Sequence, residues 1–277
     1  MTKQLLIYEQ AIPVSSQRHG DWSVKTGKDY EFSREVNSVP LLALEFPGAA
    51  SEYAIVFAGG EETVMPAVIL GVKDGQNLYL TETGGWDAKY VPAFLRRYPF
   101  VFSGSDDGER FALCIDEDFA GCNQEGRGER LFDSEGEYTQ YLRSVLEFLK
   151  GYQAQFRRTQ AFCKKLKDLD LLESMQAQFT LGTGEQVSLA GFLAINRDRL
   201  KALSGDQLAE LARTDELELM YMHLQSMRNF TAMVQRVNPP AAAEAEEGSD
   251  DTAPVAQESA EEPPTDEKPP KNGQQKS

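Results

Sequence analysis

The sequence SEGEYTQYLRSVLEFLKGYQAQFRRTQAFCKKLKDL (residues 134–169) decides the fold class, because the spacing of apolar residues becomes helical at this point. Apolar and aromatic side chains recur about every 3.6 positions, which is typical of an amphipathic helix with one buried face. Ser134 and Glu137 fit a capping box, in which a hydroxyl and a carboxylate bind free backbone N–H groups at a helix start. The pattern therefore predicts a long helix after Ser134, flexed at Gly151.

The chain before this helix is β-rich from residue 1 to about residue 130. Asp74-Gly75 and Asp107-Gly108 each lie between two strand-like runs, which is the signature of a tight hairpin turn. Because such short connections join antiparallel neighbours, we predict an antiparallel meander or a partly open barrel. Residues 40–50 fit either a strand or a helical turn. The strand-like runs are YAIVF (residues 53–57), AVIL (67–70), LYL (78–80), FVF (100–102) and FALCI (111–115).

The chain after the long helix combines one hairpin with further helices. FTL (residues 179–181) and VSL (187–189) flank a glycine-containing turn, and FLAI (192–195) is a further extended run. Asn196 and Ser204 are each placed to cap a helix, since their side chains accept hydrogen bonds from free backbone N–H groups. Thr214 opens a final helix with an apolar stripe.

These patterns predict an α+β protein with one domain over residues 1–237. Its β-rich half, residues 1–130, packs with a mainly helical half, residues 131–237. Residues 238–277 carry 10 acidic and 3 basic side chains among many prolines and alanines. Such a composition cannot bury enough apolar surface to order itself, so we expect a disordered acidic tail.

The composition also limits the partners. The formal net charge is −16, and an acidic protein lacks the basic surface that binding to nucleic acid or an anionic membrane requires. No apolar run approaches the ~20 residues of a membrane-spanning helix, and the N-terminus has no secretory signal. Three cysteines without a CxxC pair and two histidines predict neither a metal site nor a cofactor. We therefore expect a soluble, reduced, cytoplasmic protein, with leaderless export to the cell surface left open.

The strongest candidate site is GGWDAKYVPAFLRRYPF (residues 84–100), where Arg96 and Arg97 lie among aromatic residues. One interpretation is a clamp for a carboxylate, phosphate or sugar acid, with Trp86, Tyr90 and Tyr98 stacking on a ring or on a guanidinium. The other is that one arginine is a structural lock and the second is a surface charge. Arg97 is then the lock, because it leads directly into a predicted core strand.

The carboxylates expected to pair with a locking arginine are Glu45 and Asp116. Otherwise Asp116, with Glu117 and Asp118, is expected to form a solvated acidic loop rather than a metal site, since successive strand residues do not converge. No catalytic residues are expected.

Three polar residues, His223, Ser226 and Asn229, are spaced to lie near one stripe of the last helix. A helix interior rarely exposes a nucleophile, and a Ser–His pair also needs an orienting acid. We therefore expect a hydrogen-bonded seam against the β-rich half.

A series of short segments matches a known family: VPL (39–41), EFP (45–47), YAIVF (53–57), NLY (77–79), residues 86–100, CID (114–116), LFD (131–133), GEYT (136–139), and then Gly191, Leu200, Leu203, Leu211, Leu217, His223, Leu224, Ser226 and Asn229. Taken in this order, the segments resemble the SapC family over about residues 10–237, with Ala54 standing where that family usually has proline. The resemblance implies a non-enzymatic accessory or binding protein linked to a bacterial surface layer or envelope, acting on a protein partner or a small anionic ligand. A module that binds an anionic or sugar-like ligand through Trp86, Arg96 and Arg97 is the alternative, and an uncharacterised enzyme is a third. Some members are called permeases, a role that the absence of a membrane span disfavours.

Overall fold

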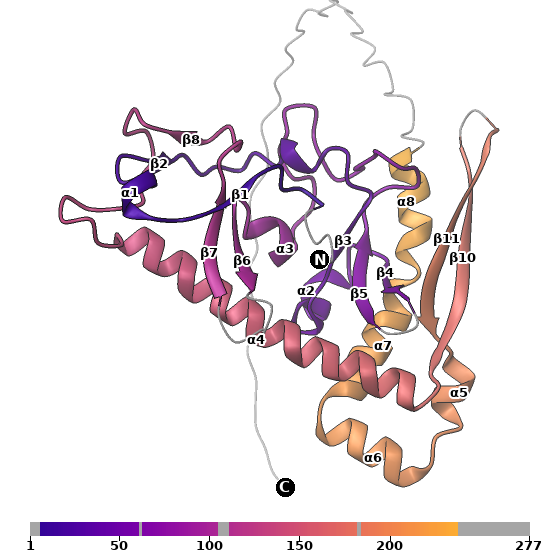
Figure 1. Ribbon diagram of the computed structural model, residues 1–277. Helices are drawn as coiled ribbons and strands as arrows, with labels where there is room; N and C mark the ends of the chain where they lie inside the picture. The colour runs from indigo at the N-terminus through magenta and orange to yellow at the C-terminus, as the bar shows by residue number, and fades with distance from the viewer. Residues whose placement is uncertain (1–5, 61–62, 105–110, 182–183, 238–277) are drawn as a thin grey trace, which may run out of the picture. The chain divides into compact units, whose positions relative to one another are not determined.

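The computed structural model describes residues 6–60, 63–104, 111–181 and 184–237 (Figure 1). These residues belong to one compact unit, Met1–Pro240. Their helices and antiparallel strands confirm the α+β class. The predicted acidic tail, residues 238–277, lies outside the described residues.

The largest sheet has the strand order β10-β11-β4-β5-β3 and is antiparallel throughout. The strands β10 and β11 confirm the predicted hairpin of residues 179–181 with 187–189, and Phe179 lies opposite Val187 in it. The hairpin joins β4 through the register pair Leu193 and Phe57. This sheet therefore joins strands of the β-rich first half to the hairpin of the mainly helical second half. Its strands are β3 (Ser38–Pro40), β4 (Ile55–Gly59), β5 (Val64–Ile69), β10 (Leu172–Thr180) and β11 (Gln186–Ile195).

Two smaller antiparallel sheets have the orders β1-β7-β6 and β8-β2-β9. The described strands thus form three separate antiparallel sheets, and none of the three closes into a barrel. The cause is pairing between distant segments, such as Ile12 with Ile115 and Val24 with Glu129. The strands are β1 (Ala11–Pro13), β2 (Ser23–Val24), β6 (Phe100–Gly104), β7 (Phe111–Asp116), β8 (Cys122–Asn123) and β9 (Glu129–Arg130).

The two predicted hairpin turns have different outcomes. Asp74-Gly75 forms a turn, with Gly75 at φ 70°, a left-handed conformation that glycine adopts without strain. The segment after this turn is not a strand, although Leu78 N–H donates to Leu70 O at 2.8 Å. Asp107-Gly108 lies outside the described residues, but the flanking strands pair as expected, with Gly104 opposite Phe111.

The long helix α4 (Gln140–Asp168) packs against β5, β6 and β9, and in Figure 1 it runs below β5 and β6. It continues unbroken through Gly151. It begins later than predicted, because Thr139 rather than Ser134 is the N-cap and its side chain accepts a hydrogen bond from Leu142 N–H at 3.3 Å. The Asp133 side chain instead accepts from the N–H groups of Glu135 and Glu137, which holds these residues in a turn.

The C-terminal helices confirm two predicted caps. Asn196 caps α5 and Ser204 caps α6, the latter in a capping box with Gln207. The predicted final helix is two helices, with a break between Ser226 and Asn229. The helices are α5 (Arg197–Lys201), α6 (Gly205–Arg213), α7 (Glu216–Ser226) and α8 (Asn229–Val237).

Residues 40–50 contain both structures that their sequence allows. Pro40 ends β3, and two short helical turns follow it, η2 and α2. The turns in the first hundred residues are α1 (Ser16–His19), η1 (Glu31–Ser33), η2 (Ala43–Glu45), α2 (Phe46–Ala49) and α3 (Ala93–Arg96).

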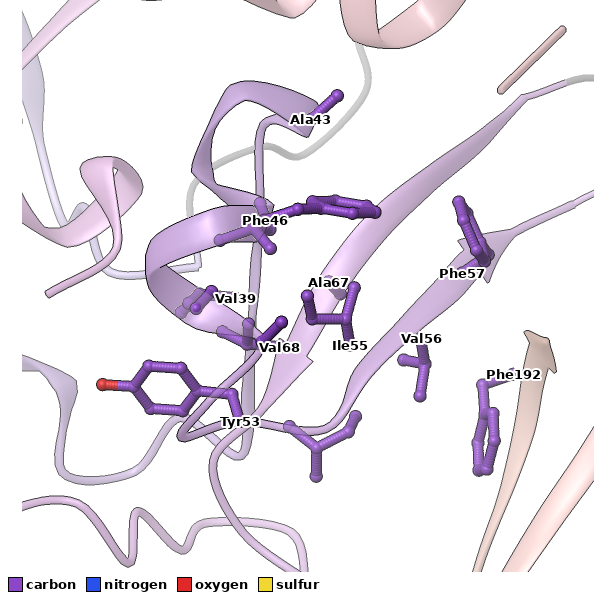
Figure 2. Packing of buried hydrophobic residues seen from close by; sticks show 14 of the residues in the cluster. Val39, Ala43, Phe46, Tyr53, Ile55, Val56, Phe57, Ala67, Val68 and Phe192 are labelled. Atoms are coloured by element: carbon purple, nitrogen blue, oxygen red, sulfur yellow. The ribbon is translucent and has the colours of Figure 1, made fainter. Parts of the chain in front are cut away.

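The main core lies between α2 and the strands β4 and β5, where Phe46, Ile55 and Val68 are fully buried (Figure 2). A second cluster lies under the N-terminal half of α4 and includes Leu142 and Ile115. Truncating a buried Phe or Ile to alanine costs about 2–5 kcal/mol, so these contacts hold α4 firmly beside the sheets. The surface between α4 and residues 90–97 is therefore built on a rigid base.

Candidate functional site

The segment of residues 84–100 is held in place by hydrogen bonds to its backbone. Trp86 Nε1 donates to the Tyr90 carbonyl at 3.0 Å and to the Tyr53 hydroxyl at 2.9 Å, and that hydroxyl also donates to the Tyr90 carbonyl. The carboxylate of Glu52 accepts from the N–H groups of Lys89 and Tyr90, at 3.0 and 2.8 Å. Trp86 is therefore a scaffold residue that fixes the position of Tyr90.

The side chain of Tyr90 is fixed equally well at its other end. Its hydroxyl donates to Glu45 Oε1 at 2.7 Å, and burial, together with this hydrogen bond, raises the Tyr90 pKa above its usual range. A Cβ atom at Gly48 would lie 2.8 Å from the Tyr90 ring, so only glycine leaves room for it. The Tyr90 side chain is therefore held in one position and is uncharged at neutral pH.

Glu45 is buried, but it is already saturated with hydrogen bonds. Besides Tyr90, the N–H groups of Ala93 and Leu42 donate to it at 2.7 and 2.9 Å. A carboxylate that accepts three such bonds is a structural anchor rather than a free acid or base.

The two arginines diverge at α3. Arg96 is exposed and lies over the rings of Tyr90 and Phe148, at 5.9 and 5.5 Å from their centroids, while its Nε donates to Val91 O at 3.0 Å. Arg97 is buried and faces the rings of Phe94 and Tyr152, among others. The two side chains line different cavities.

Arg96 lines a cleft of about 330 Å³ between α4 and residues 90–96. Leu42, Ala93 and Phe148 give it apolar walls, and Tyr90 and Arg96 add a phenol ring and a cation. We call this the Arg96 cleft. Its lining also includes the carboxylates of Glu45 and Glu147, the latter in an ion pair with Lys150 at 2.7 Å. The cleft therefore combines an apolar surface with one arginine, which is the general chemistry of a small-ligand site.

Gly151 keeps the Arg96 cleft open. A Cβ atom at this position would meet no other atom within 4 Å, so packing does not demand glycine here. Glycine in a helix interior costs about 0.5–1 kcal/mol relative to alanine. A glycine that lowers helix stability and leaves space in a cleft is consistent with a binding role for that space.

The structure does not bring the five candidate site residues together. Tyr90 and Arg96 share the Arg96 cleft. Arg97 lines a different cavity, together with Phe102 and Gln153. Trp86 packs among Tyr30, Tyr53 and Tyr79. Tyr98 stacks on Phe32, with ring centroids 4.2 Å apart, and its hydroxyl donates to Asp116 at 3.2 Å.

Sequence reasoning missed the α4 side of the cleft. Phe148, Gly151, Tyr152 and Gln155 line it, and their spacing of three, four and seven residues places them on one helix face. That periodicity was visible in the sequence, but nothing in it indicated that this part of the apolar face borders a cleft rather than the core.

Asp116 is fully buried, so the expectation of a solvated acidic loop is wrong for this residue. Its carboxylate accepts from the N–H groups of Glu9 and Gln10, at 2.9 and 3.1 Å, which ties the N-terminal segment to β7. Neither Asp116 nor Glu45 is in an ion pair with Arg97 among the described residues.

Glu117 forms a separate polar cluster with Arg18 and His19. Arg18 donates to it through Nε and Nη2, which is the main reason that the Glu117 pKa lies below its usual range. His19 Nε2 lies 2.9 Å from this carboxylate, and its Nδ1 accepts from Ser15 N–H at 3.2 Å. Both ring nitrogens of His19 are therefore committed to the scaffold. No cluster of potential metal ligands occurs in the described part of the chain.

The predicted seam of His223, Ser226 and Asn229 is confirmed. Ile195 N–H donates to His223 Nε2 at 3.0 Å, and Ile55 N–H donates to Ser226 Oγ at 3.1 Å. Asn229 Nδ2 donates to two carbonyl groups before β4. The Ser226 hydroxyl donates to the His223 carbonyl rather than to its ring, so the two do not form a catalytic pair. Burial lowers the His223 pKa to about 4.

The fold and these contacts define an antiparallel α+β protein whose ionisable core residues serve the scaffold and whose aromatic cleft carries one arginine. Within the described residues, no helix is both long and apolar enough to cross a membrane. The SapC family model matches residues 14–233, and the chain belongs to the SapC family. Comparison with the curated proteins and with the solved structures gave no match.

Proposed function

We propose that this SapC-family protein is a non-enzymatic binding protein whose Arg96 cleft takes a small ligand with an apolar group and one carboxylate or phosphate. The observation that carries the proposal is the cleft itself, in which Arg96 lies over two rings above an apolar floor that Gly151 leaves open. An apolar group would fill the floor, and the anion would meet the guanidinium through charge-assisted hydrogen bonds.

Binding is favoured over catalysis by how the cleft's polar groups are used. Glu45 accepts three hydrogen bonds, and Tyr90 is held neutral by burial and by Glu45. Neither is placed as a base beside a nucleophile, which acyl transfer and related reactions require. Arg96 has no ion-pair partner among the described residues, so its charge is open to a ligand.

The setting that we propose for this binding is the bacterial surface layer or envelope. The support is the resemblance to the SapC family, which implies such a link; the family model itself matches residues 14–233. In that setting the protein acts as an accessory that holds an anionic component, rather than as a transporter.

The proposal is tested with pairs of probes that differ only in charge. N-acetylphenylalanine and N-acetylleucine carry a carboxylate, and their amides do not. We expect calorimetry to detect binding of the two acids and no binding of their amides. A hydrogen bond to a charged group is worth about 1.5–3 kcal/mol, so Arg96→Met should weaken binding of the acids by about 10-fold or more.

Two further variants locate the site. Gly151→Phe should fill the cleft and abolish binding while the protein stays folded, because the position has free space. Arg158→Met is the matched control, since Arg158 lies on the same helix and does not line the cleft. Equal binding of acid and amide, or equal affinities in the Arg96 and Arg158 variants, would refute the Arg96 cleft as the site.

A further inference from the structure

Arg97 is a buried cation in an aromatic environment. It is only 8% exposed, and its guanidinium carbon lies 4.3, 4.9 and 5.6 Å from the ring centroids of Phe94, Tyr152 and Tyr8. Its Nε has no hydrogen-bond partner among the described residues. A buried donor left unpaired is unusual in proteins and indicates a missing acceptor.

Among the described residues, no carboxylate forms an ion pair with Arg97. Burial raises the pKa of Tyr152 to about 12 and that of Tyr8 above its usual range, so neither hydroxyl carries a negative charge at neutral pH. The nearby carboxylates of Glu45 and Asp116 accept hydrogen bonds from other groups and form no ion pair with Arg97. Ring faces attract a cation, but they do not neutralise it.

The Arg97 side chain lines a cavity of about 160 Å³. Leu149, Tyr152, Gln153 and Phe156 of α4 form one side, and Phe102 of β6 lies on another. The cavity is about five times the ~30 Å³ that a water molecule occupies in the liquid, so it suits a small anion rather than a large ligand. Gln153 adds an amide that can donate a second hydrogen bond.

We propose that this cavity binds one small oxyanion of the size of phosphate or sulfate, with Arg97 as its cation. Nε belongs to the side of the guanidinium that binds oxyanions with two parallel hydrogen bonds, and it is the atom left without an acceptor. The site is separate from the Arg96 cleft, although Tyr152 contributes to both.

The first test is thermal unfolding of the full chain in sodium phosphate and in sodium chloride at equal ionic strength. Phosphate should raise the midpoint of the wild type progressively with concentration, because a ligand that binds only the folded state stabilises it by mass action. Arg97→Met, which keeps the length and loses the charge, should remove this response. Arg158→Met is the control and should keep it.

The second test does not depend on removing Arg97. Gln153→Glu places a carboxylate in the cavity that Arg97 lines, so it should raise the midpoint without phosphate and weaken phosphate binding at least 10-fold in calorimetry. Gln153→Leu, a neutral replacement of similar size, should not raise the midpoint. This pair of variants keeps the proposal testable even if Arg97→Met does not fold.

Several results would overturn the proposal. The wild type could respond to phosphate no more than to chloride, Arg97→Met could respond fully, or Gln153→Glu could lower the midpoint. Residues 105–110 include Asp106, Asp107 and Glu109 and lie outside the described residues. A phosphate response that appears only when these three are neutralised together would assign the counter-ion to the chain itself, and the proposed site would then be wrong.

Discussion

Acidification should destabilise the protein through His223, whose imidazole is buried on α7 beside the Phe57 ring. Its Nε2 accepts from Ile195 N–H, so a proton added there would break that hydrogen bond and bury a positive charge. For this reason burial lowers its pKa to about 4, against 6.5 for an unperturbed histidine. The unfolded chain therefore takes up a proton at a higher pH than the folded protein does, and lower pH favours unfolding.

The size of the effect follows from the two pKa values. The stabilisation that His223 contributes is present above pH 6.5 and is lost as the pH falls toward 4. Between pH 7 and pH 5 the loss is about 1.8 kcal/mol, and below pH 4 it approaches about 3.4 kcal/mol, from 1.36 kcal/mol for each pKa unit. For a domain of this size the loss at pH 5 corresponds to a fall of about 4–7 °C in the thermal midpoint.

Urea unfolding at pH 7 and pH 5 measures this loss, and His223→Gln is the control. A glutamine carbonyl can accept from Ile195 N–H and does not titrate, so the variant should lose about 1.8 kcal/mol less than the wild type over this interval. Because the chain has only two histidines, NMR can follow both rings directly. A His223 ring that titrates near 6.5, or equal losses in wild type and variant, would refute the reasoning.

Three further predictions concern the helices and the tail. Gly151→Ala should raise the free energy of unfolding by about 0.5–1 kcal/mol, measured in urea, because the new methyl group meets no atom and alanine favours the helix; a loss would show that the position is constrained. Thr139→Ala should cost about 1 kcal/mol and Ser134→Ala almost nothing in the same assay, since Thr139 is the N-cap of α4; the reverse order would contradict the cap assignment. Deleting residues 238–277 should leave the calorimetric midpoint nearly unchanged, and a fall of several degrees would show that these residues pack on the domain.

Local features of the fold could be predicted from the sequence because their causes are local. The helical period fixes α4, and the side chains of Asn196 and Ser204 fix the starts of α5 and α6. The start of α4 was misplaced because Ser134 and Thr139 are both acceptable caps, and the preference is decided by the turn around Asp133. When two residues are equally suitable as an N-cap, neighbouring contacts decide which one caps the helix, and the capping pattern alone does not contain those contacts.

The arrangement of the sheets and the burial of Asp116 could not be predicted in the same way. Phe57 of β4 pairs with Leu193 of β11, which lies about half the chain length away, and no periodicity encodes which strands become neighbours. Asp116 looked like a solvated acid because charged residues follow it. Its burial depends on N–H groups of residues 9 and 10, more than a hundred positions away, that need an acceptor.

The adjacent arginines show how one helical turn separates two side chains that the sequence places side by side. Successive residues of a helix point about 100° apart, so Arg96 and Arg97 at the end of α3 face different surroundings. Arg96 meets the rings of Tyr90 and Phe148 at an open cleft, whereas Arg97 meets Phe94, Tyr152 and Tyr8 in the interior. A ligand in either cavity therefore meets one guanidinium. If both proposals hold, Arg97→Met should abolish the phosphate response and leave binding of N-acetylphenylalanine intact, and Arg96→Met should do the opposite. Loss of both responses in either variant would mean that the two cavities act as one site across Tyr152.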